Sequence, residues 1–392
     1  EQLHYGQAEN VYKYFASAGN DKSALNSKGY LHFYGQSFEN LSYLLIQIFN
    51  IENIYDFRHI LSVIIGWLII VLTGIFTVRL KNVQAGILAM ILLFLSPHFL
   101  GHCYNNLTDI PFAFSYLFFL YHCYRMFGEL PKITPFRFVM LSIGLFLSIS
   151  NRVGGMICIP LMFLFTAVYI FIYRKSNIIT IKMIVIIFLK LLFISIIGIL
   201  CSILIWPYAI ENGIEGIISS IDFMSNIPTG IYQLFEGQNI LSVNLPDYFL
   251  IKSILITTPV IIFSGVALYT YFGIIRKKAL FFISLFILLS FIFPLVYIII
   301  KKSNVYSSWR HVLFIYPFII ISSAIGLEMG ISYFKNKFLK IATIVSVGLL
   351  LVLPLKHIAS SHPYEYIYYN ELNGGLKEAY GFYELDYFYN ST

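Results

Sequence analysis

The chain alternates between long apolar stretches and short polar segments over most of its 392 residues. A helix needs about 20 mostly apolar residues to cross the hydrocarbon core of a bilayer. By that length we predict ten membrane-spanning helices, and we expect the short fourth one, which Asn151 and Arg152 follow, to be tilted or broken. The predicted spans are 59–78, 84–100, 111–127, 136–150, 156–173, 183–205, 251–274, 279–300, 311–329 and 338–355. The predicted fold class is therefore all-α, a polytopic transmembrane helix bundle.

The composition agrees with this pattern. Hydrophobic residues make up 58% of the chain and charged residues 11%, which is about half the charged share of a soluble protein. A soluble protein of this composition would have too little polar surface to cover its core. The composition also excludes a disordered chain, a collagen-like repeat and a small disulfide scaffold. The net charge of +7 does not indicate nucleic-acid binding, because the positions of the basic residues explain it.

The basic residues set the expected orientation in the membrane. Fourteen of the 26 lysines and arginines fall in five short loops on one side of the predicted topology, which by the positive-inside rule is the cytoplasmic side. They are Arg79, Lys81, Arg125, Lys132, Arg137, Arg174, Lys175, Lys182, Arg276, Lys277, Lys278, Lys335, Lys337 and Lys340. Among the acidic residues, only Glu129 and Glu328 lie near cytoplasmic ends. We expect a multi-pass protein of the plasma (inner) membrane with its active site on the periplasmic or extracellular side, although a solvated loop surface would show the same acidic bias.

The long polar segments all lie on the outer side of this topology. They divide the chain into a first outer loop (1–57), a transmembrane bundle (58–355) and an outer tail (356–392). The bundle carries outer loops at 96–110, 206–250 and 301–310. Residues 38–50 have the pattern of an amphipathic helix that lies on the membrane surface. The tyrosines of the tail are typical of an aromatic belt at the lipid headgroups.

Two outer carboxylates are candidates for chemistry. Glu1 opens the run Glu1-Gln-Leu-His4-Tyr5-Gly6, which by itself indicates only a solvated loop. Asp109 stands two positions before Pro111, at the outer end of a predicted span. An aspartate there suits a helix N-cap, whereas a carboxylate that faces a cavity at the membrane surface is usually functional. The sequence gives both interpretations of Asp109 equal weight.

Two groups of cations lie on the side that the orientation rule disfavours. Arg152 lies between two spans in the run Ser-Asn-Arg-Val-Gly-Gly. Lys301 and Lys302 precede the run Trp309-Arg310-His311, in which we expect Trp309 to pack against the bound ligand. Arg152 could extend to lipid phosphates, or its guanidinium could clamp a bound phosphate group. Two separate outer basic sites favour an anionic ligand.

A metal site is not predicted. His98 and His102 share a helix face and Cys103 is adjacent, but this group lacks a convincing fourth ligand. The four cysteines do not indicate an intramolecular disulfide, because only Cys103 lies in an outer loop. The sequence has no GxGxxG, P-loop, HExxH or GxSxG motif.

Several motifs occur together in an order that resembles one family. They are E-x-x-H-Y-G at the start, H-F-Y-G-x-x-F-E (32–39), G-H-C-Y-N-N-x-x-D-I-P-F-A, N-R-V-G-G, L-P-D-Y (245–248), R-H-V-L-F-I-Y-P and H-P-Y-x-Y-x-Y-Y-N-x-L-x-G-G. The chain resembles, over essentially its whole length, the bacterial glycosyltransferases that use polyprenyl-phosphate sugars. These are relatives of the protein O-mannosyltransferases and the lipid A aminoarabinose transferases. The resemblance implies a GT-C membrane fold with outer-face loops and juxtamembrane helices.

The resemblance also implies roles for individual residues. Glu1 matches the second member of an acidic pair in the family's first outer loop, and Asp109 matches the second acidic position. The helix that precedes that loop in the family is missing, so we expect a chain that lacks its first transmembrane helix. The branch often has N-N-P-K-D where this chain has Asn105-Asn106-Leu107-Thr108-Asp109, so a lysine that could contact phosphate is missing.

The expected function is transfer of a sugar from a polyprenyl-phosphate donor to an acceptor hydroxyl in one inverting displacement. Such a reaction needs a carboxylate to take the proton of the acceptor and cations to stabilise the departing phosphate. We assign Glu1, or the neighbour missing before it, as base, and Asp109 as the residue that orients the acceptor or the first loop. No cofactor is required, although Glu1 and Asp109 could together bind a divalent cation. The expected substrate- and phosphate-binding residues are His4, Asn105, Asn106, Arg152, Arg310, His311 and His362.

Other functions remain open at this stage. A transporter or lipid flippase would have charged or broken helices near the membrane midplane and repeated halves, but the ionisable residues lie mostly outside the spans, with Lys190 as the main exception. An O-antigen polymerase or ligase would share the lipid-linked chemistry. A catalytically silent binding protein is the third alternative. The sequence does not identify the sugar or the acceptor.

Overall fold

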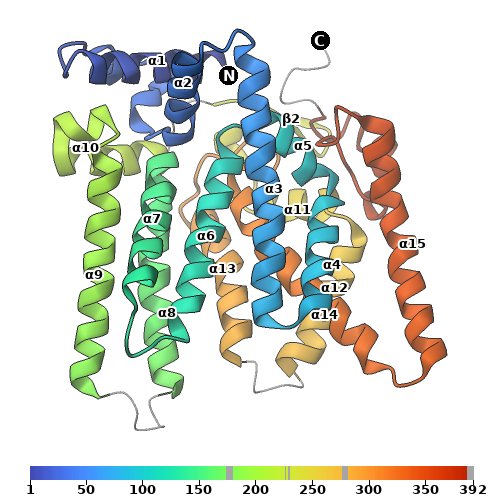
Figure 1. Ribbon diagram of the computed structural model, residues 1–392. Helices are drawn as coiled ribbons and strands as arrows, with labels where there is room; N and C mark the ends of the chain where they lie inside the picture. The colour runs from blue at the N-terminus through green and yellow to red at the C-terminus, as the bar shows by residue number, and fades with distance from the viewer. Residues whose placement is uncertain (174–179, 226, 228–229, 276–280, 386–392) are drawn as a thin grey trace. The chain divides into compact units, whose positions relative to one another are not determined.

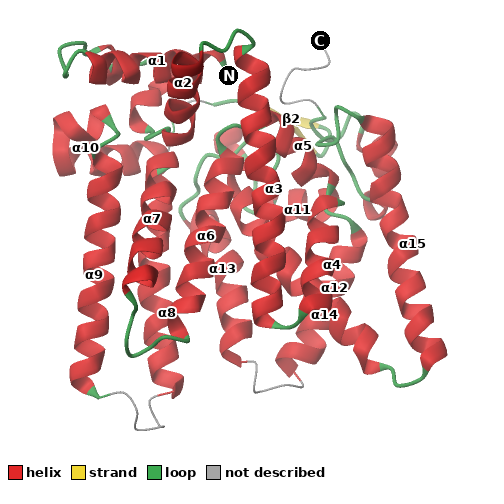
Figure 2. Cartoon of the chain, in the orientation of Figure 1, coloured by secondary structure: helices red, strands yellow, loops and turns green. Residues whose placement is uncertain are grey.

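The computed structural model describes residues 1–173, 180–225, 227, 230–275 and 281–385. The chain is almost entirely helical, with one short β-hairpin (Figures 1 and 2). The predicted all-α class is therefore confirmed. The basic loops around Arg174 and Arg276 and the first two residues of the predicted span 279–300 lie outside the described residues. The longer elements are α1 (Gln2–Ala16), α2 (Ser37–Phe49), α3 (Ile54–Leu80), α4 (Val83–Phe94), α5 (Pro97–Asn105), α6 (Asp109–Phe127), α7 (Pro135–Asn151), α8 (Cys158–Tyr173), α9 (Ile181–Ile203), α10 (Pro207–Ser225), β1 (Tyr232–Phe235), β2 (Gln238–Leu241), α11 (Phe249–Thr257), α12 (Val260–Tyr269), α13 (Phe281–Ile300), α14 (Tyr316–Tyr333), α15 (Lys337–Ser361) and α16 (Gly375–Ala379).

Within the described residues, six helices are long and apolar enough to cross a membrane, and two bent helix pairs raise that number to eight. The six contain α3, α8, α9, α13, α14 and α15, each at the position of a predicted span. The predicted spans 111–127 and 136–150 correspond to α6, which has 19 residues, and α7, which has 17. The expected break in the short span is not found, since α7 is one uninterrupted helix.

Two predicted spans are not single helices. The predicted span 84–100 is divided into α4 and α5, whose axes differ by 65°, and the predicted span 251–274 into α11 and α12, which differ by 109°. Pro97 and Pro259 stand at the two breaks. A proline has no N–H to donate, and it forces the preceding residue into an extended conformation. Each of these two predicted spans is therefore a bent pair of helices.

The helices form two compact units, which we describe separately. The first unit contains residues 1–65 and 107–227. Here α7 packs between α6 and α9, and α2 packs on both α1 and α7. The helices α1, α2 and α10 lie at one end of α6, α7 and α9 (Figure 1). The predicted amphipathic helix 38–50 is confirmed as α2.

The second unit contains residues 66–106 and 228–392. Its centre is α14, which packs against α4, α12 and α13. A Cβ on Gly326 would lie 2.0 Å from the carbonyl oxygen of Gly265, so only glycine allows α14 to approach α12 this closely. The strands β1 and β2 pair antiparallel.

A residue of the tail satisfies backbone carbonyl groups at the break between α11 and α12. The Asn370 side chain donates hydrogen bonds to the carbonyl oxygens of Leu255 and Thr258, at 2.6 and 2.7 Å. Those carbonyls lose their helical partners at the break, and apolar surroundings would leave them unsatisfied. Tyr366, Tyr368 and Tyr369, close by in the tail, are buried. For these three tyrosines the expectation of an aromatic belt was wrong.

Candidate functional site

A buried ion pair joins α2 to α3 in the first unit. Arg58 is fully buried, and its Nη2 donates to Oε2 of Glu39 at 2.5 Å. Sequence analysis did not identify either residue. A signal was present, because Glu39 shares one helix face with Ser42, Tyr43 and Ile46, all of which are buried. A carboxylate on the buried face of an amphipathic helix needs a cationic partner, because an unpaired buried charge is unfavourable.

Glu1 extends this pair toward solvent. Its carboxylate lies 3.3 Å from Nη1 of Arg58 and 3.1 Å from Nε2 of His59. Burial acts to raise the pKa of Glu1, but the hydrogen bond and charge of His59 and the charge of Arg58 outweigh it, so the pKa is lowered. Glu39 behaves in the opposite way, because its burial raises the pKa despite the neighbouring guanidinium. Of the two carboxylates, Glu1 is the one held in the ionised form and open to solvent.

Asp109 forms a second ion pair, with Arg152. Asp109 is the first residue of α6 and Arg152 follows the last residue of α7, and their Oδ1 and Nη2 atoms are 2.5 Å apart. The N-cap of α6 is Thr108, so Asp109 does not occupy the cap position that one interpretation gave it. The Nε of Arg152 is buried and has no hydrogen-bond partner among the described residues. The guanidinium therefore retains a donor for a further ligand.

Asn151 fixes the backbone beside Arg152. Its Oδ1 accepts hydrogen bonds from the Ser37 hydroxyl and the Phe38 N–H, at 3.0 and 3.3 Å. Its Nδ2 donates to the Ser115 hydroxyl at 3.0 Å. The first turn of α2 is thus capped by a residue of α7, since its own N-cap makes no side-chain cap. A Cβ on Gly35 would lie 2.3 Å from the Ser150 carbonyl oxygen, so the loop before α2 can approach α7 only with glycine there.

His4 lies near both ion pairs. Its Nδ1 donates to Oε1 of Gln36 at 2.5 Å, which leaves Nε2 as the acceptor nitrogen. Burial lowers the pKa of His4 to about 4; the Gln36 hydrogen bond opposes this, and the charges of Arg58 and Arg152 add to it. His4 is therefore neutral at pH 7. A neutral imidazole with a free acceptor nitrogen suits a hydroxyl donor better than a phosphate oxygen.

The first unit contains a cavity of about 750 Å³. Pockets for small molecules commonly have volumes of roughly 300–1,000 Å³ and apolar walls. The walls come from α1, α2, α6 and α7 and are mostly aliphatic and aromatic, and the polar residues among them are Ser37, Asn40, Ser115 and Asn151. Pro111 and Asn151, which line the cavity, are close neighbours of Asp109 and Arg152 in the chain. Asp109 and Arg152 do not line the cavity themselves, but each lies within two positions of a residue that does.

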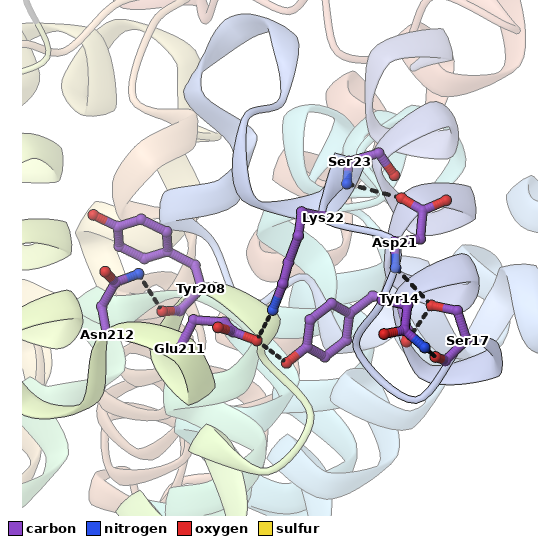
Figure 3. A network of polar contacts seen from close by, with 9 residues as sticks. Tyr14, Ser17, Asp21, Lys22, Ser23, Tyr208, Glu211 and Asn212 are labelled. Atoms are coloured by element: carbon purple, nitrogen blue, oxygen red, sulfur yellow. Dashed lines mark hydrogen bonds and ion pairs between the residues drawn. The ribbon is translucent and has the colours of Figure 1, made fainter.

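The helix α1 forms part of the cavity wall, and side chains at and after its C-terminal end contact α10. Tyr14 donates its hydroxyl hydrogen to Glu211 at 2.7 Å, and Lys22 makes an ion pair with the same carboxylate oxygen (Figure 3). The hydrogen bond from Lys22 is the largest cause of the lowered pKa of Glu211. The loop between Tyr14 and Lys22 is ordered by hydrogen bonds of Ser17 and Asp21 to nearby backbone N–H groups. These contacts hold α1 in place over the cavity.

The remaining predicted site residues lie in the second unit. Nδ2 of Asn105 donates to the Gly101 carbonyl oxygen, within its own helix. Asn106 begins a directional chain in which its amide donates to Nδ1 of His102, Nε2 of His102 donates to Nε2 of His98, and Nδ1 of His98 donates to the Tyr366 carbonyl oxygen. The direction follows from the carbonyl, which can only accept. His98 and His102 therefore hydrogen-bond to each other.

Arg310 and His311 both contact Tyr306. The guanidinium carbon of Arg310 lies 5.0 Å from the centre of the Tyr306 ring, and the His311 ring is edge-on to it. The Nε of Arg310 is buried without a hydrogen-bond partner among the described residues. Trp309, which we expected beside a lipid or sugar, is instead fully buried, and its Nε1 donates to Oγ1 of Thr257. That expectation was wrong because Trp309 stacks on His98 inside the unit.

His362 is oriented by a buried carboxylate. Its Nδ1 lies 2.5 Å from Oε1 of Glu365, whose side chain is 1% exposed while that of His362 is 66% exposed. Glu365 was not identified from the sequence. The exposed imidazole is held in one orientation and is open to a ligand.

Glu1 and Asp109, which we expected could bind a divalent cation together, each lie beside a cationic side chain. Among the residues that the structure describes, no three His, Cys, Asp or Glu side chains are grouped so that they could hold a metal ion.

Comparison with known proteins gives matches at the level of structure alone. No protein-family model matches the chain, and no curated protein does. The archaeal oligosaccharyltransferase AglB from Archaeoglobus fulgidus, in complex with an inhibitory peptide and a dolichol-phosphate, matches with a TM-score of 0.60 and 12% identity over 92% of this chain. ArnT from Cupriavidus metallidurans, bound to undecaprenyl phosphate, matches with a TM-score of 0.54 and 11% identity over 91% of this chain. The chain spans 51% of the AglB chain and 66% of the ArnT chain. The protein is a multi-pass membrane protein, and it has the GT-C fold.

Proposed function

We propose that the protein is a membrane glycosyltransferase that moves a sugar from a polyprenyl-phosphate donor to an acceptor hydroxyl. The observation that carries the proposal is the Asp109–Arg152 ion pair, within two positions of residues that line an apolar cavity of about 750 Å³. A polyprenyl phosphate has the matching chemistry, an anionic head on a long apolar chain. The two structural neighbours described with dolichol-phosphate and undecaprenyl phosphate support the same class of donor.

The proposed reaction is one inverting displacement. The acceptor oxygen attacks the anomeric carbon, and the bond from that carbon to the phosphate oxygen breaks as the phosphate leaves with the electron pair. Glu1 is ionised at neutral pH, since its pKa is lowered, and as a carboxylate it takes the acceptor proton. The neutral His4 can accept a hydrogen bond from an acceptor hydroxyl. Asp109 positions Arg152, whose unused Nε donor is available to the departing phosphate.

The second unit has candidate phosphate ligands of its own. Arg310 has an unused buried donor and is held by Tyr306, and His362 is held by Glu365. Arg310, His311 and His362 keep the role expected from the sequence. Asn105 and Asn106 are engaged within the unit, which favours a supporting role for them. By the distribution of basic loops, we propose that the reaction takes place on the periplasmic or extracellular face.

The proposal is tested by following the release of the lipid phosphate. Purified full-length protein is incubated with radiolabelled polyprenyl-phosphate sugars and a mixture of acceptors, and we expect free polyprenyl phosphate to appear. Asp109→Asn should lower release about 10- to 100-fold, whereas Asp222→Asn, at an exposed carboxylate of α10, should leave it unchanged. Equal release by the two variants would contradict the assignment of Asp109.

Transport is the second candidate, because bent helices such as α4–α5 and α11–α12 also occur in transporters. An assay in proteoliposomes that contain the labelled donor distinguishes transport from sugar transfer. A transporter would move the intact donor across the bilayer without releasing lipid phosphate. An O-antigen polymerase or ligase would instead release it only with a glycan acceptor.

A further inference from the structure

A second, polar cavity lies in the second unit, between the start of α11 and the end of α13. Its volume is about 240 Å³. Five hydrogen-bonding residues line it, together with aliphatic side chains of α13 and of the L-P-D-Y segment. The proposed transfer reaction uses none of these residues. They are Ser242, Asn244, Asp247, Lys302 and Ser303.

Two opposite charges line the cavity without pairing. Asp247 and Lys302 make no ion pair with each other, and neither side chain has a hydrogen bond or ion pair with any other described residue. Two opposite charges in one cavity usually form an ion pair. Because Asp247 and Lys302 do not, they are complementary to a ligand that carries both a positive and a negative charge.

The backbone at Lys302 is in the left-handed conformation. Lys302 has φ of +50° and is the second residue after the end of α13. The N–H of Ser303 bonds to the Ile298 carbonyl oxygen and that of Lys302 to the Ile299 carbonyl oxygen. This is a helix ending whose left-handed residue is usually glycine or asparagine. A lysine adopts this conformation with strain, and its side chain then lines the cavity.

The surface next to the cavity is apolar. At the end of α13 the side chains of Val296, Tyr297 and Ile300 are 44%, 43% and 74% exposed, and Ile251 at the start of α11 is 44% exposed. Both helices belong to apolar spans or bent pairs. Exposed apolar side chains on such helices face lipid. A ligand in the cavity can therefore have acyl chains along these helices.

We propose that this cavity binds the headgroup of a phospholipid with a primary ammonium, with the phosphate on Lys302 and the ammonium on Asp247. The ammonium N–H groups can also donate to the Asn244 amide oxygen and the Ser303 hydroxyl. A quaternary choline headgroup has no N–H to donate. A glycerol headgroup has no positive charge for Asp247. The inference does not depend on the proposed transferase activity.

Native mass spectrometry of the full chain in detergent tests the assignment. The protein is mixed with equal amounts of phosphatidylethanolamine, phosphatidylglycerol and phosphatidylcholine of identical acyl chains. We expect the ethanolamine lipid to be retained about 10-fold more than either of the others, the lower end of what one hydrogen bond to a charged group contributes. Lys302→Gln should lower retention of all three lipids, because each has a phosphate.

Two variants make the test specific. Asp247→Asn should remove the preference and leave the ethanolamine and glycerol lipids within about twofold of each other. Lys301→Gln changes an exposed neighbour that does not line the cavity, and it should retain lipids like the wild type. Equal wild-type retention of the ethanolamine and glycerol lipids would overturn the proposal, as would a preference that survives in Asp247→Asn. Equal losses in Lys301→Gln and Lys302→Gln would also overturn it, since they would show a general attraction of the helix end for anions.

Discussion

Asp109 at the start of α6 and Arg152 just after the end of α7 lie together at the open end of the hairpin formed by these helices, with 2.5 Å between Oδ1 and Nη2. The start of α6 and the end of α7 are thereby held together beside the apolar cavity. Because the carboxylate occupies one nitrogen of the guanidinium, it also fixes the direction in which the remaining donors point. The pair therefore couples the geometry of the hairpin to the proposed phosphate site.

Arg152→Gln should lower turnover of the polyprenyl-phosphate donor about 10- to 100-fold, because a hydrogen bond to a charged group contributes roughly 1.5–3 kcal/mol. Arg152→Lys should recover only part, since an ammonium does not reproduce the guanidinium fork. The Asp109→Asn/Arg152→Gln double variant should lose less than the sum of the two single losses. Initial rates of lipid-phosphate release measure all three, with Arg79→Gln at an exposed position of α3 as control. Additive losses would show that the two residues act independently.

Arg58→Ala should destabilise the first unit by about 3–5 kcal/mol, because it leaves the buried Glu39 carboxylate without its partner. Glu39→Gln should be milder, since the amide remains a hydrogen-bond acceptor for the guanidinium. Thermal unfolding in detergent gives the ranking. An unfolding temperature of Arg58→Ala equal to that of the wild type would mean that water reaches Glu39.

His4 should make stability depend on pH between about 7 and 5. Its pKa is about 4 in the folded protein, below the ordinary 6.5. From pH 6.5 down to about 4 the unfolded chain therefore binds a proton that the folded chain does not. The stability contributed by neutral His4 is present above pH 6.5 and is lost as the pH falls through this window.

Unfolding temperatures of the wild type and His4→Gln, measured from pH 7 to pH 5, test this dependence. The wild type should lose stability over this range and the variant should lose less. The measurement stays above the range in which Glu1, with its lowered pKa, takes up a proton. Identical slopes for the two proteins would place His4 in contact with solvent.

Leu41→Trp should raise the KM for the lipid donor about 10-fold, because the larger side chain occupies part of the apolar cavity. Leu41 is 52% exposed, so the protein should still fold. Ile48→Trp is the matched control, since Ile48 lies on the same helix with 59% exposure and does not line the cavity. A higher KM in both variants would point to a general disturbance of α2.

The positions of the spans could be predicted from the sequence, because apolar length alone decides whether a helix can cross a bilayer. The breaks could not be predicted, and the prolines show why. Pro97 and Pro259 stand at breaks, whereas Pro294 and Pro354 lie inside continuous helices. At Pro259 the freed carbonyls find a donor in Asn370, more than a hundred positions away in the chain. Only the folded chain shows that such a partner is present.

Part of the candidate site could be predicted from the sequence, and the rest depends on which side chains the folded chain buries. Asp109 and Arg152 stood out because charges are rare at those positions of the chain. Glu39 and Arg58 did not, because a charge in a polar loop or on an amphipathic helix is ordinary until its burial is known. Trp309 was misplaced because an aromatic residue near the end of a span packs against lipid or protein equally well.

The close approach of Gly265 and Gly326 has a mechanical consequence. At Gly265 and Gly326 the backbones of α12 and α14 contact each other directly, without side chains between them. Neither helix can slide or rotate past the other without a collision of main-chain atoms. We therefore expect α12 and α14 to move together as one rigid pair. The 109° corner between α11 and α12 lies at the start of this pair, where Asn370 holds it.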